Sequence, residues 1–104
     1  MSLDIVKNRE GGTLEVVLNG RLDTNTSPDL EAVVKQDLDG VTKLVLDMAG
    51  LEYISSAGLR VVLAAHKAMT TQGEMVVRGP REFIMNIFEL TGFLEILTIE
   101  DSAA

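Results

Sequence analysis

The chain has no cysteine and no tryptophan, and only one histidine and two prolines among its 104 residues. Without cysteine there can be no disulfide, no thiolate nucleophile and no cysteine-ligated zinc or iron–sulfur site. A single histidine, His66, excludes a metal site built from several imidazoles. The first residues lack the basic and apolar regions of a signal peptide, and no stretch approaches the roughly 18 apolar residues of a membrane span. We therefore expect a cytoplasmic protein.

Basic residues are also scarce. Nine Lys and Arg stand against 16 Asp and Glu, which gives a net charge of −7 and a sequence pI near 4.5. Such a surface repels phosphate backbones and anionic lipid headgroups unless a local basic patch compensates. The basic residues are scattered singly between Lys7 and Arg81. The sequence therefore predicts neither a nucleic-acid partner nor a membrane partner.

The length and the hydrophobic content describe one globular domain spanning residues 1–104. With 46% hydrophobic residues the chain is large enough to bury a core of its own. Hydrophobic periodicity, proline and glycine positions divide it into strands and helices. Strands are expected at residues 3–5, 14–18, 43–48, 74–78 and 94–99, and helices at residues 27–39, 57–70 and 81–91.

The helix boundaries follow from capping residues. Ser27 is predicted as a helix N-cap with Pro28 at the first helical position, and Gly92 is predicted to end the last helix. Segments 21–26 and 50–56 are expected to be loops. Apolar side chains of the helices and the methionines are expected to fill the core, including Met48, Met69, Met75, Met85, Phe83, Ile84, Ile87 and Phe88.

Strands that alternate with helices imply parallel crossovers. The initial two-strand hairpin adds an antiparallel pair. The predicted fold class is therefore α/β, with a mixed, mostly parallel sheet and helices packed on it.

The segment around Ser55 and Ser56 needs more than folding to explain it. It places two hydroxyls, a small residue and Gly58 at the beginning of a helix, after a parallel strand, where open α/β sheets place their sites. A hydroxyl there can be an N-cap and nothing more. It can also accept a phosphoryl group, because free N–H groups and the positive end of the helix dipole favour an anion. The sequence leaves open which serine caps the helix.

Four segments together resemble the STAS domain of bacterial anti-sigma factor antagonists, over nearly the whole chain. They are the Gly-x-Leu-Asp pattern at residues 20–23, an apolar strand ending in Asp47, the run from Leu51 to Leu59, and the Phe-x-Leu-Thr-Gly-Phe-Leu element at residues 88–94. The serine-containing run is the most specific of the four.

The resemblance implies a protein-binding switch. Family members of this kind bind, when unphosphorylated, an anti-sigma factor that is also a serine kinase, and so free a sigma factor for transcription. The kinase phosphorylates the antagonist at the helix start and a serine phosphatase resets it. Carried over residue by residue, Gly58 matches the motif glycine and the phosphoacceptor falls on Ser56. Ser55 stands where many antagonists have Asp, and Ala57 stands where a second Ser or Thr is common.

The residues expected to contact the partner surround that serine: Asp23, Thr24, Ser55, Ser56, Gly58 and Arg60. We predict a non-enzymatic switch without a cofactor or a metal. The alternative that keeps the fold is a constitutive STAS subunit of another signalling or lipid-transport complex, in which Ser56 is only a cap.

Two other functions are weaker. A serine hydrolase would use Ser56 with His66 as its base, but no glycine precedes Ser56 by two residues, and ten positions along a helix separate the two by roughly 15 Å. A magnesium site at Asp23 and Asp47 would need further oxygen ligands, and carboxylates at strand ends commonly cap loops.

Overall fold

The computed structural model describes residues 2–101. Its elements are β1 (Leu3–Glu10), β2 (Thr13–Leu22), α1 (Ser27–Gln36), β3 (Lys43–Ile54), α2 (Ser56–Met69), β4 (Glu74–Arg78), α3 (Glu82–Thr91), the 3₁₀ helix η1 (Phe93–Glu95) and β5 (Thr98–Glu100). The strands form one sheet in the order β1-β2-β3-β4-β5. β1 is antiparallel to β2, and the other neighbours are parallel. The α/β fold class with a mixed, mostly parallel sheet is confirmed.

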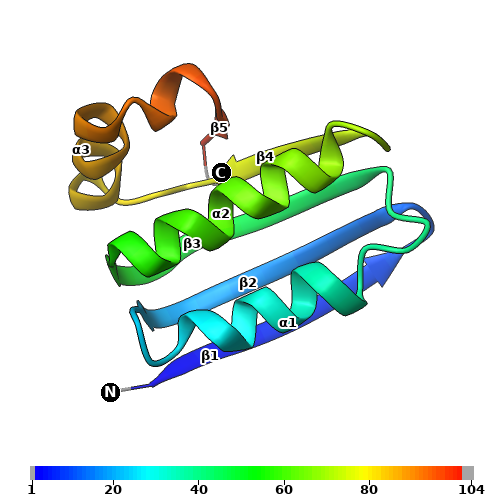
Figure 1. The fold of residues 1–104 in the computed structure, drawn as a ribbon, viewed down its shortest axis with the longest axis horizontal. Helices are drawn as coiled ribbons and strands as arrows, with labels where there is room; N and C mark the ends of the chain where they lie inside the picture. The colour runs from blue at the N-terminus through cyan, green and yellow to red at the C-terminus, as the bar shows by residue number, and fades with distance from the viewer. Residues whose placement is uncertain (1, 102–104) are drawn as a thin grey trace.

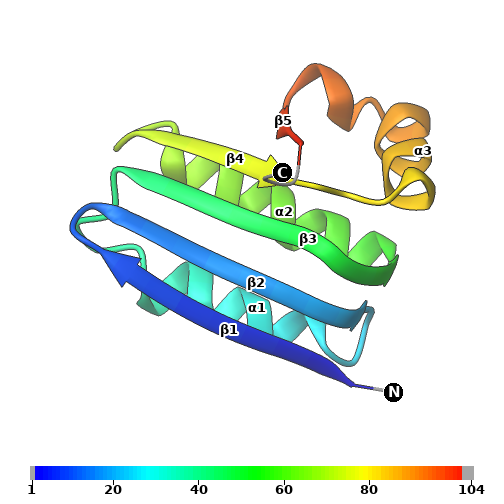
Figure 2. The same ribbon diagram turned by 180° about the vertical axis from the view of Figure 1, so that it is seen from behind.

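Two helices cover one face of this sheet. α1 and α2 lie side by side on it, whereas α3 lies beyond the end of β4 (Figure 1). In β2 the side chains of Leu14, Val16 and Leu18 alternate with less buried ones and belong to the core cluster. Seen from behind, the other face of β1, β2 and β3 carries no helix from residues 2–101 (Figure 2). α2, the longest helix within residues 2–101, has 14 residues, and none of the helices in this range is long and apolar enough to cross a membrane.

On the sheet face that none of these helices covers, ion pairs connect the strands. The Arg78 guanidinium on β4 lies 2.7 Å from the Glu15 carboxylate on β2 and 3.0 Å from Glu100 on β5. The first of these ion pairs spans β3. Val45 and Val76 are buried there although they lie outside the main core cluster.

The core contains most of the side chains predicted for it. Ile84 and Phe88 of α3 are fully buried, and Met48, Met69 and Met75 are buried as well. The prediction for Phe83 is wrong, because its side chain is 53% exposed. Ile84 and Phe88 are four residues apart and share the buried side of α3, and Phe83 lies outside that stripe.

One of the two predicted loops is largely strand: of residues 50–56, β3 includes all but the last two, whereas of residues 21–26 only the first two belong to β2. β2 continues to Leu22 and β3 to Ile54, where these two residues are paired. Shifts of register between Val17 and Asn19 and between Gly20 and Arg21 let the strands stay paired through residues whose pattern does not alternate. The serine segment therefore follows directly from a long strand and not from a flexible crossing.

The last predicted strand is much shorter than expected. Instead of residues 94–99, the chain forms η1 and then the three residues of β5. Gly92 ends α3 as predicted, with a left-handed φ of +80° that favours glycine. The turn brings the Phe93 ring onto Phe88, with ring centroids 6.2 Å apart. This packing fixes residues 93–95 as a helical turn.

Candidate functional site

α1 and α2 begin at the same edge of the sheet. The strands before them, β2 and β3, are parallel neighbours and end opposite each other at Leu22 and Ile54. One more hydrogen bond ties the two junctions together, since the Ser55 amide donates to the Leu22 carbonyl over 2.9 Å. The loop before α1 and the beginning of α2 therefore form one continuous surface.

Ser55 is the N-cap of α2. Its backbone is extended, with φ −96° and ψ 175°, and its Oγ accepts the Gly58 N–H at 3.2 Å. Ser56 is the first helical residue, and its side chain is exposed. Within residues 2–101 no side-chain hydrogen bond to protein involves the Ser56 hydroxyl. The question left open by the sequence is thus resolved, because the cap is Ser55 and the free hydroxyl is Ser56.

Gly58 lies on the buried side of the first turn of α2. A Cβ atom at this position would lie 2.8 Å from Leu22 Cγ and 2.9 Å from the Leu22 carbonyl oxygen. Real Cβ contacts are essentially never so short, so this glycine lets α2 pack closely on the end of β2. Its predicted contact with a partner stays a prediction, and the structure gives it a packing role.

Asp23 organises the loop between β2 and α1. Its Oδ1 accepts the N–H groups of Asn25, at 2.9 Å, and Thr26, at 3.0 Å. These hydrogen bonds, the one from Thr26 first, together with the nearby Arg21 guanidinium, hold the pKa of the Asp23 carboxyl below its usual value. The carboxylate is half-buried and turned into its own loop, while its neighbour Thr24 is exposed.

The two hydroxyls at the start of α1 are both buried. The N-cap is Thr26 and not Ser27, which corrects the prediction, and the Thr26 side chain makes no capping hydrogen bond. Its Oγ1 instead donates to the Arg21 carbonyl at 2.7 Å. Ser27 is the first helical residue, and its hydroxyl donates to the Asp23 carbonyl. Both side chains serve to close the loop.

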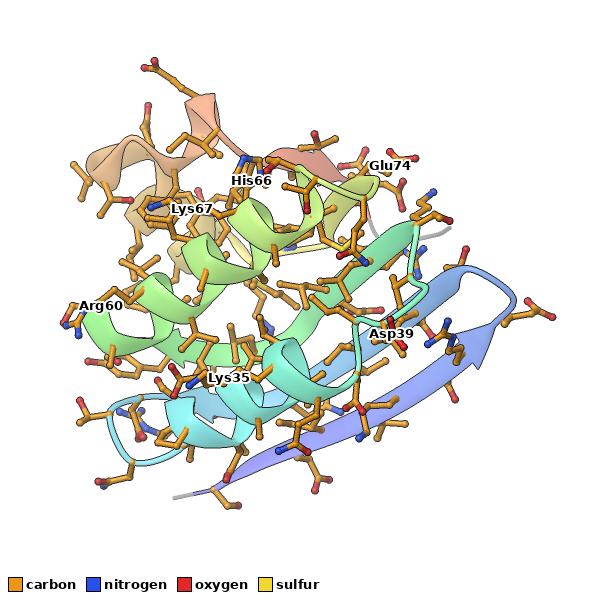
Figure 3. The ribbon with its side chains drawn as sticks, turned by 45° about the vertical axis from the view of Figure 1, so that its right-hand side comes forward. Lys35, Asp39, Arg60, His66, Lys67 and Glu74 are labelled. Atoms are coloured by element: carbon orange, nitrogen blue, oxygen red, sulfur yellow. The ribbon has the colours of Figure 1, made fainter. Side chains whose placement is uncertain are left out.

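A groove runs between α1 and α2 beside Ser56. It has a volume of about 430 Å³ and is lined by Thr24, Ser27, Pro28 and Glu31 on one side and by Ala57, Arg60, Val61 and Ala64 on the other. Arg60 points away from the domain at the beginning of α2 (Figure 3). Of the residues predicted to contact a partner, the groove brings together Thr24 and Arg60, and its lining residue Ala57 directly follows Ser56 in the chain.

The arrangement of the residues supports neither the serine-hydrolase alternative nor the magnesium-site alternative. Ser56 and His66 lie on the same helix, ten residues apart, which is roughly 15 Å of helix. Asp47 Oδ1 accepts the Ala49 N–H at 3.0 Å within β3, at the point where the register with β2 shifts. No group of three or more potential metal ligands is found in the part of the chain from residue 2 to residue 101.

Sequence reasoning missed some of this surface. The Arg21 guanidinium lies over the Tyr53 ring, 4.2 Å from its centroid, and the two residues are paired across β2 and β3. The groove residues Pro28, Glu31, Val61 and Ala64 were missed too. Only the strand register and the packing of α1 beside α2 bring these residues together, and neither can be read from local sequence.

The model of the STAS domain family matches residues 4–104. The chain belongs to the STAS domain family. BtrV of Bordetella bronchiseptica, which is named as an anti-sigma factor antagonist, is 35% identical over 96% of this chain and 88% of its own. Two solved structures share the fold. An anti-sigma factor antagonist from Mycobacterium paratuberculosis has a TM-score of 0.85 at 21% identity, covering 94% of this chain and 85% of that one. The Bacillus cell fate determinant SpoIIAA in its phosphorylated form has a TM-score of 0.77 at 17% identity, and the match covers 96% of this chain and 92% of that one.

Proposed function

We propose that this STAS domain is an anti-sigma factor antagonist whose binding is switched by phosphorylation of Ser56. In its unphosphorylated form it binds an anti-sigma factor with serine kinase activity and frees a sigma factor. A serine phosphatase restores that form. The switch works in the cytoplasm, through protein–protein contacts and without catalysis by this chain.

The observation that carries the proposal is that Ser55 and Ser56 differ in role: one caps α2 and the other has an exposed hydroxyl. Ser55 already supplies the capping oxygen of α2, so the Ser56 hydroxyl is not needed to hold the helix. The Ser56 side chain is exposed and lies at the first position of the helix, where a kinase active site can reach it. An N-cap role therefore does not explain this residue.

The helix start can carry a phosphoryl group without refolding. Phosphorylation adds about −1.5 to −2 charges, and the positive end of the α2 dipole and its free N–H groups favour an anion there. Arg60, four residues on, lies on the same side of the helix as Ser56. The structural effect of phosphorylation is thus expected to be local.

The functional effect would come from the partner. A phosphoryl group would add to a chain already at −7, in the middle of the proposed contact surface. A partner that meets Ser56 with apolar or acidic groups would be repelled and would leave buried charge behind. A loss of about 3 kcal/mol weakens binding more than a hundredfold, which is enough for a switch.

The relatives support the direction of the proposal. BtrV, at 35% identity, is named as an anti-sigma factor antagonist. SpoIIAA, a protein of the same fold, has been solved in a phosphorylated form. The acidic surface likewise suits a protein partner better than a nucleic acid or a membrane.

The experiment is a binding titration with the purified serine-kinase anti-sigma factor from the same genome. We expect Ser56→Asp to raise Kd more than a hundredfold while circular dichroism and thermal unfolding stay as in wild type. Thr71→Asp is the matched control, because it places the same charge just beyond the other end of α2, at an exposed hydroxyl. Wild-type affinity in Ser56→Asp would contradict the switch and favour the constitutive-subunit alternative.

A further inference from the structure

The exposed apolar side chains of this domain are concentrated near its C-terminus. Four large apolar side chains are exposed within residues 2–101, and three of them, Phe83, Leu90 and Ile96, fall between residues 83 and 96. Phe83 is 53% exposed and Leu90 is 86% exposed. Single exposed apolar residues are ordinary, but several on one element mark an interaction surface.

α3 is more apolar than its packing in this domain requires. Six of its ten residues are large and apolar: Phe83, Ile84, Met85, Ile87, Phe88 and Leu90. Only Ile84 and Phe88 are buried, and the helix lies beyond the end of β4 with one side against the core (Figure 1). A helix that is apolar on most sides is normally covered on more than one.

Phe83, Ile87 and Leu90 share one side of the helix. Their spacing of four and three residues places them in a stripe about two turns long, which we name the α3 stripe. Ile87 in the middle is half-buried and contacts the core cluster, while both ends of the stripe are exposed. The stripe is thus anchored to the domain and open outward.

The helix that carries the α3 stripe lies at the end of the domain where α2 begins (Figure 1), and Ser56 is the first residue of α2. The domain measures 32 × 27 × 27 Å. A protein–protein interface of ordinary size covers about 800 Å² on each partner, or a patch roughly 30 Å across. A partner seated on Ser56 therefore has a footprint wide enough to reach α3.

Charge indicates which occupant fits. The exposed carboxylates of Glu82 and Glu89 directly precede Phe83 and Leu90 in the helix. A second copy of this chain would bring the same acidic residues and the same net charge of −7 against them. A partner with an apolar pocket rimmed by Lys or Arg would match both the stripe and its flanks.

We propose that the α3 stripe is a second anchor for the anti-sigma factor that docks at Ser56, held by an apolar pocket with a basic rim. This inference rests on the proposed function, which names that partner. The stripe would supply affinity that does not depend on the phosphorylation state, whereas Ser56 would supply the switch.

The test is a titration of Leu90→Asp, Val6→Asp and Ser56→Asp with the same serine-kinase anti-sigma factor. That partner is chosen because it phosphorylates the wild-type chain. Leu90→Asp is expected to raise Kd at least tenfold, as truncation or charging of an interface hot spot does. Because the Leu90 side chain is almost fully exposed, the Leu90→Asp variant should fold like wild type, and thermal unfolding verifies this. Val6→Asp is the control, since it charges another exposed apolar side chain, on the edge strand β1 at the opposite side of the sheet (Figure 2).

The outcomes separate the two proposals. Weakened binding in Leu90→Asp with Val6→Asp unchanged supports the α3 stripe. Wild-type affinity in Leu90→Asp, with Ser56→Asp still defective, overturns the stripe and leaves the switch standing. A defect in Leu90→Asp without one in Ser56→Asp supports the stripe and contradicts the switch. A wild-type dimer in analytical ultracentrifugation that Leu90→Asp dissociates would assign the stripe to a second copy and overturn the inference.

Discussion

Two helices begin at the same edge of this sheet, and each begins with two adjacent hydroxyl side chains. At the start of α1, Thr26 and Ser27 are both buried, and their hydroxyls donate to the carbonyls of Arg21 at the end of β2 and Asp23 in the loop. At the start of α2, Ser55 caps the helix and Ser56 is exposed. The residue types are nearly the same, but their surroundings are not.

The difference shows that the position of a hydroxyl decides whether it is free to react. In the loop before α1, the Asp23 carboxylate accepts the N–H groups of Asn25 and Thr26, and the Asp23 carbonyl accepts the Ser27 hydroxyl. β3 leads into α2 without such a loop, and one serine is enough to cap it. The hydroxyl of the second serine, Ser56, is therefore not needed for capping.

The largest expected effect concerns which hydroxyl accepts phosphate. With the serine-kinase anti-sigma factor and ATP, Ser56→Ala should reduce incorporation of radiolabelled phosphate to background. Ser27→Ala should leave it close to wild type, because the Ser27 side chain is buried. Substantial incorporation into Ser56→Ala would move the acceptor elsewhere and break the contrast between the two helix starts.

Gly58→Ala should destabilise the fold by about 2 kcal/mol. Alanine is favoured over glycine in helices by up to about 1 kcal/mol, so any loss has to come from the close approach to Leu22. Urea unfolding followed by circular dichroism measures it. An unchanged or higher midpoint would mean that α2 can move away from β2 without cost.

The hydroxyls themselves should rank by their hydrogen bonds. Ser27→Ala and Ser55→Ala are each expected to cost about 1 kcal/mol, the first through a buried hydrogen bond and the second through the cap. Ser56→Ala should stay within about 0.5 kcal/mol of wild type, as exposed substitutions do. The same urea titrations provide the test, and a Ser56→Ala loss as large as that of Ser55→Ala would contradict the assignment of the cap.

The smallest effect is a dependence of stability on pH. Because the pKa of Asp23 is lowered in the folded chain, its contribution is complete above the unfolded value near 4 and is lost as the pH falls through the folded value. Asp23→Asn keeps an oxygen for the loop N–H groups but cannot titrate. Its urea midpoint should therefore fall less than that of wild type between pH 5 and pH 3, and parallel curves would show that Asp23 contributes nothing.

Local patterns predicted the elements well where burial alternates with exposure or where a glycine ends a helix. Gly92 and the buried Ile84 and Phe88 are examples. The far ends of β2 and β3 were missed because their pairing depends on register shifts that no local pattern encodes. Phe83 was misjudged because α3 is apolar on most sides, and only its place beyond β4 decides which side is buried.

For the candidate site, sequence reasoning could name a segment but not which of its two serines caps the helix. Ser55 and Ser56 are both plausible caps by residue type, and the choice depends on where β3 ends. The groove between α1 and α2 depends on how two helices lie side by side, so its α1 residues Pro28 and Glu31 had no local signal. The packing role of Gly58 likewise appears only with Leu22 beneath it.

The most direct test of the central claim is phosphosite mapping by mass spectrometry on the protein isolated from its own growing and stressed cells. The account predicts phosphate on Ser56, with an occupancy that changes between the two conditions, and none on the buried Thr26 or Ser27. Absence of phosphate from Ser56 under every condition would contradict the account.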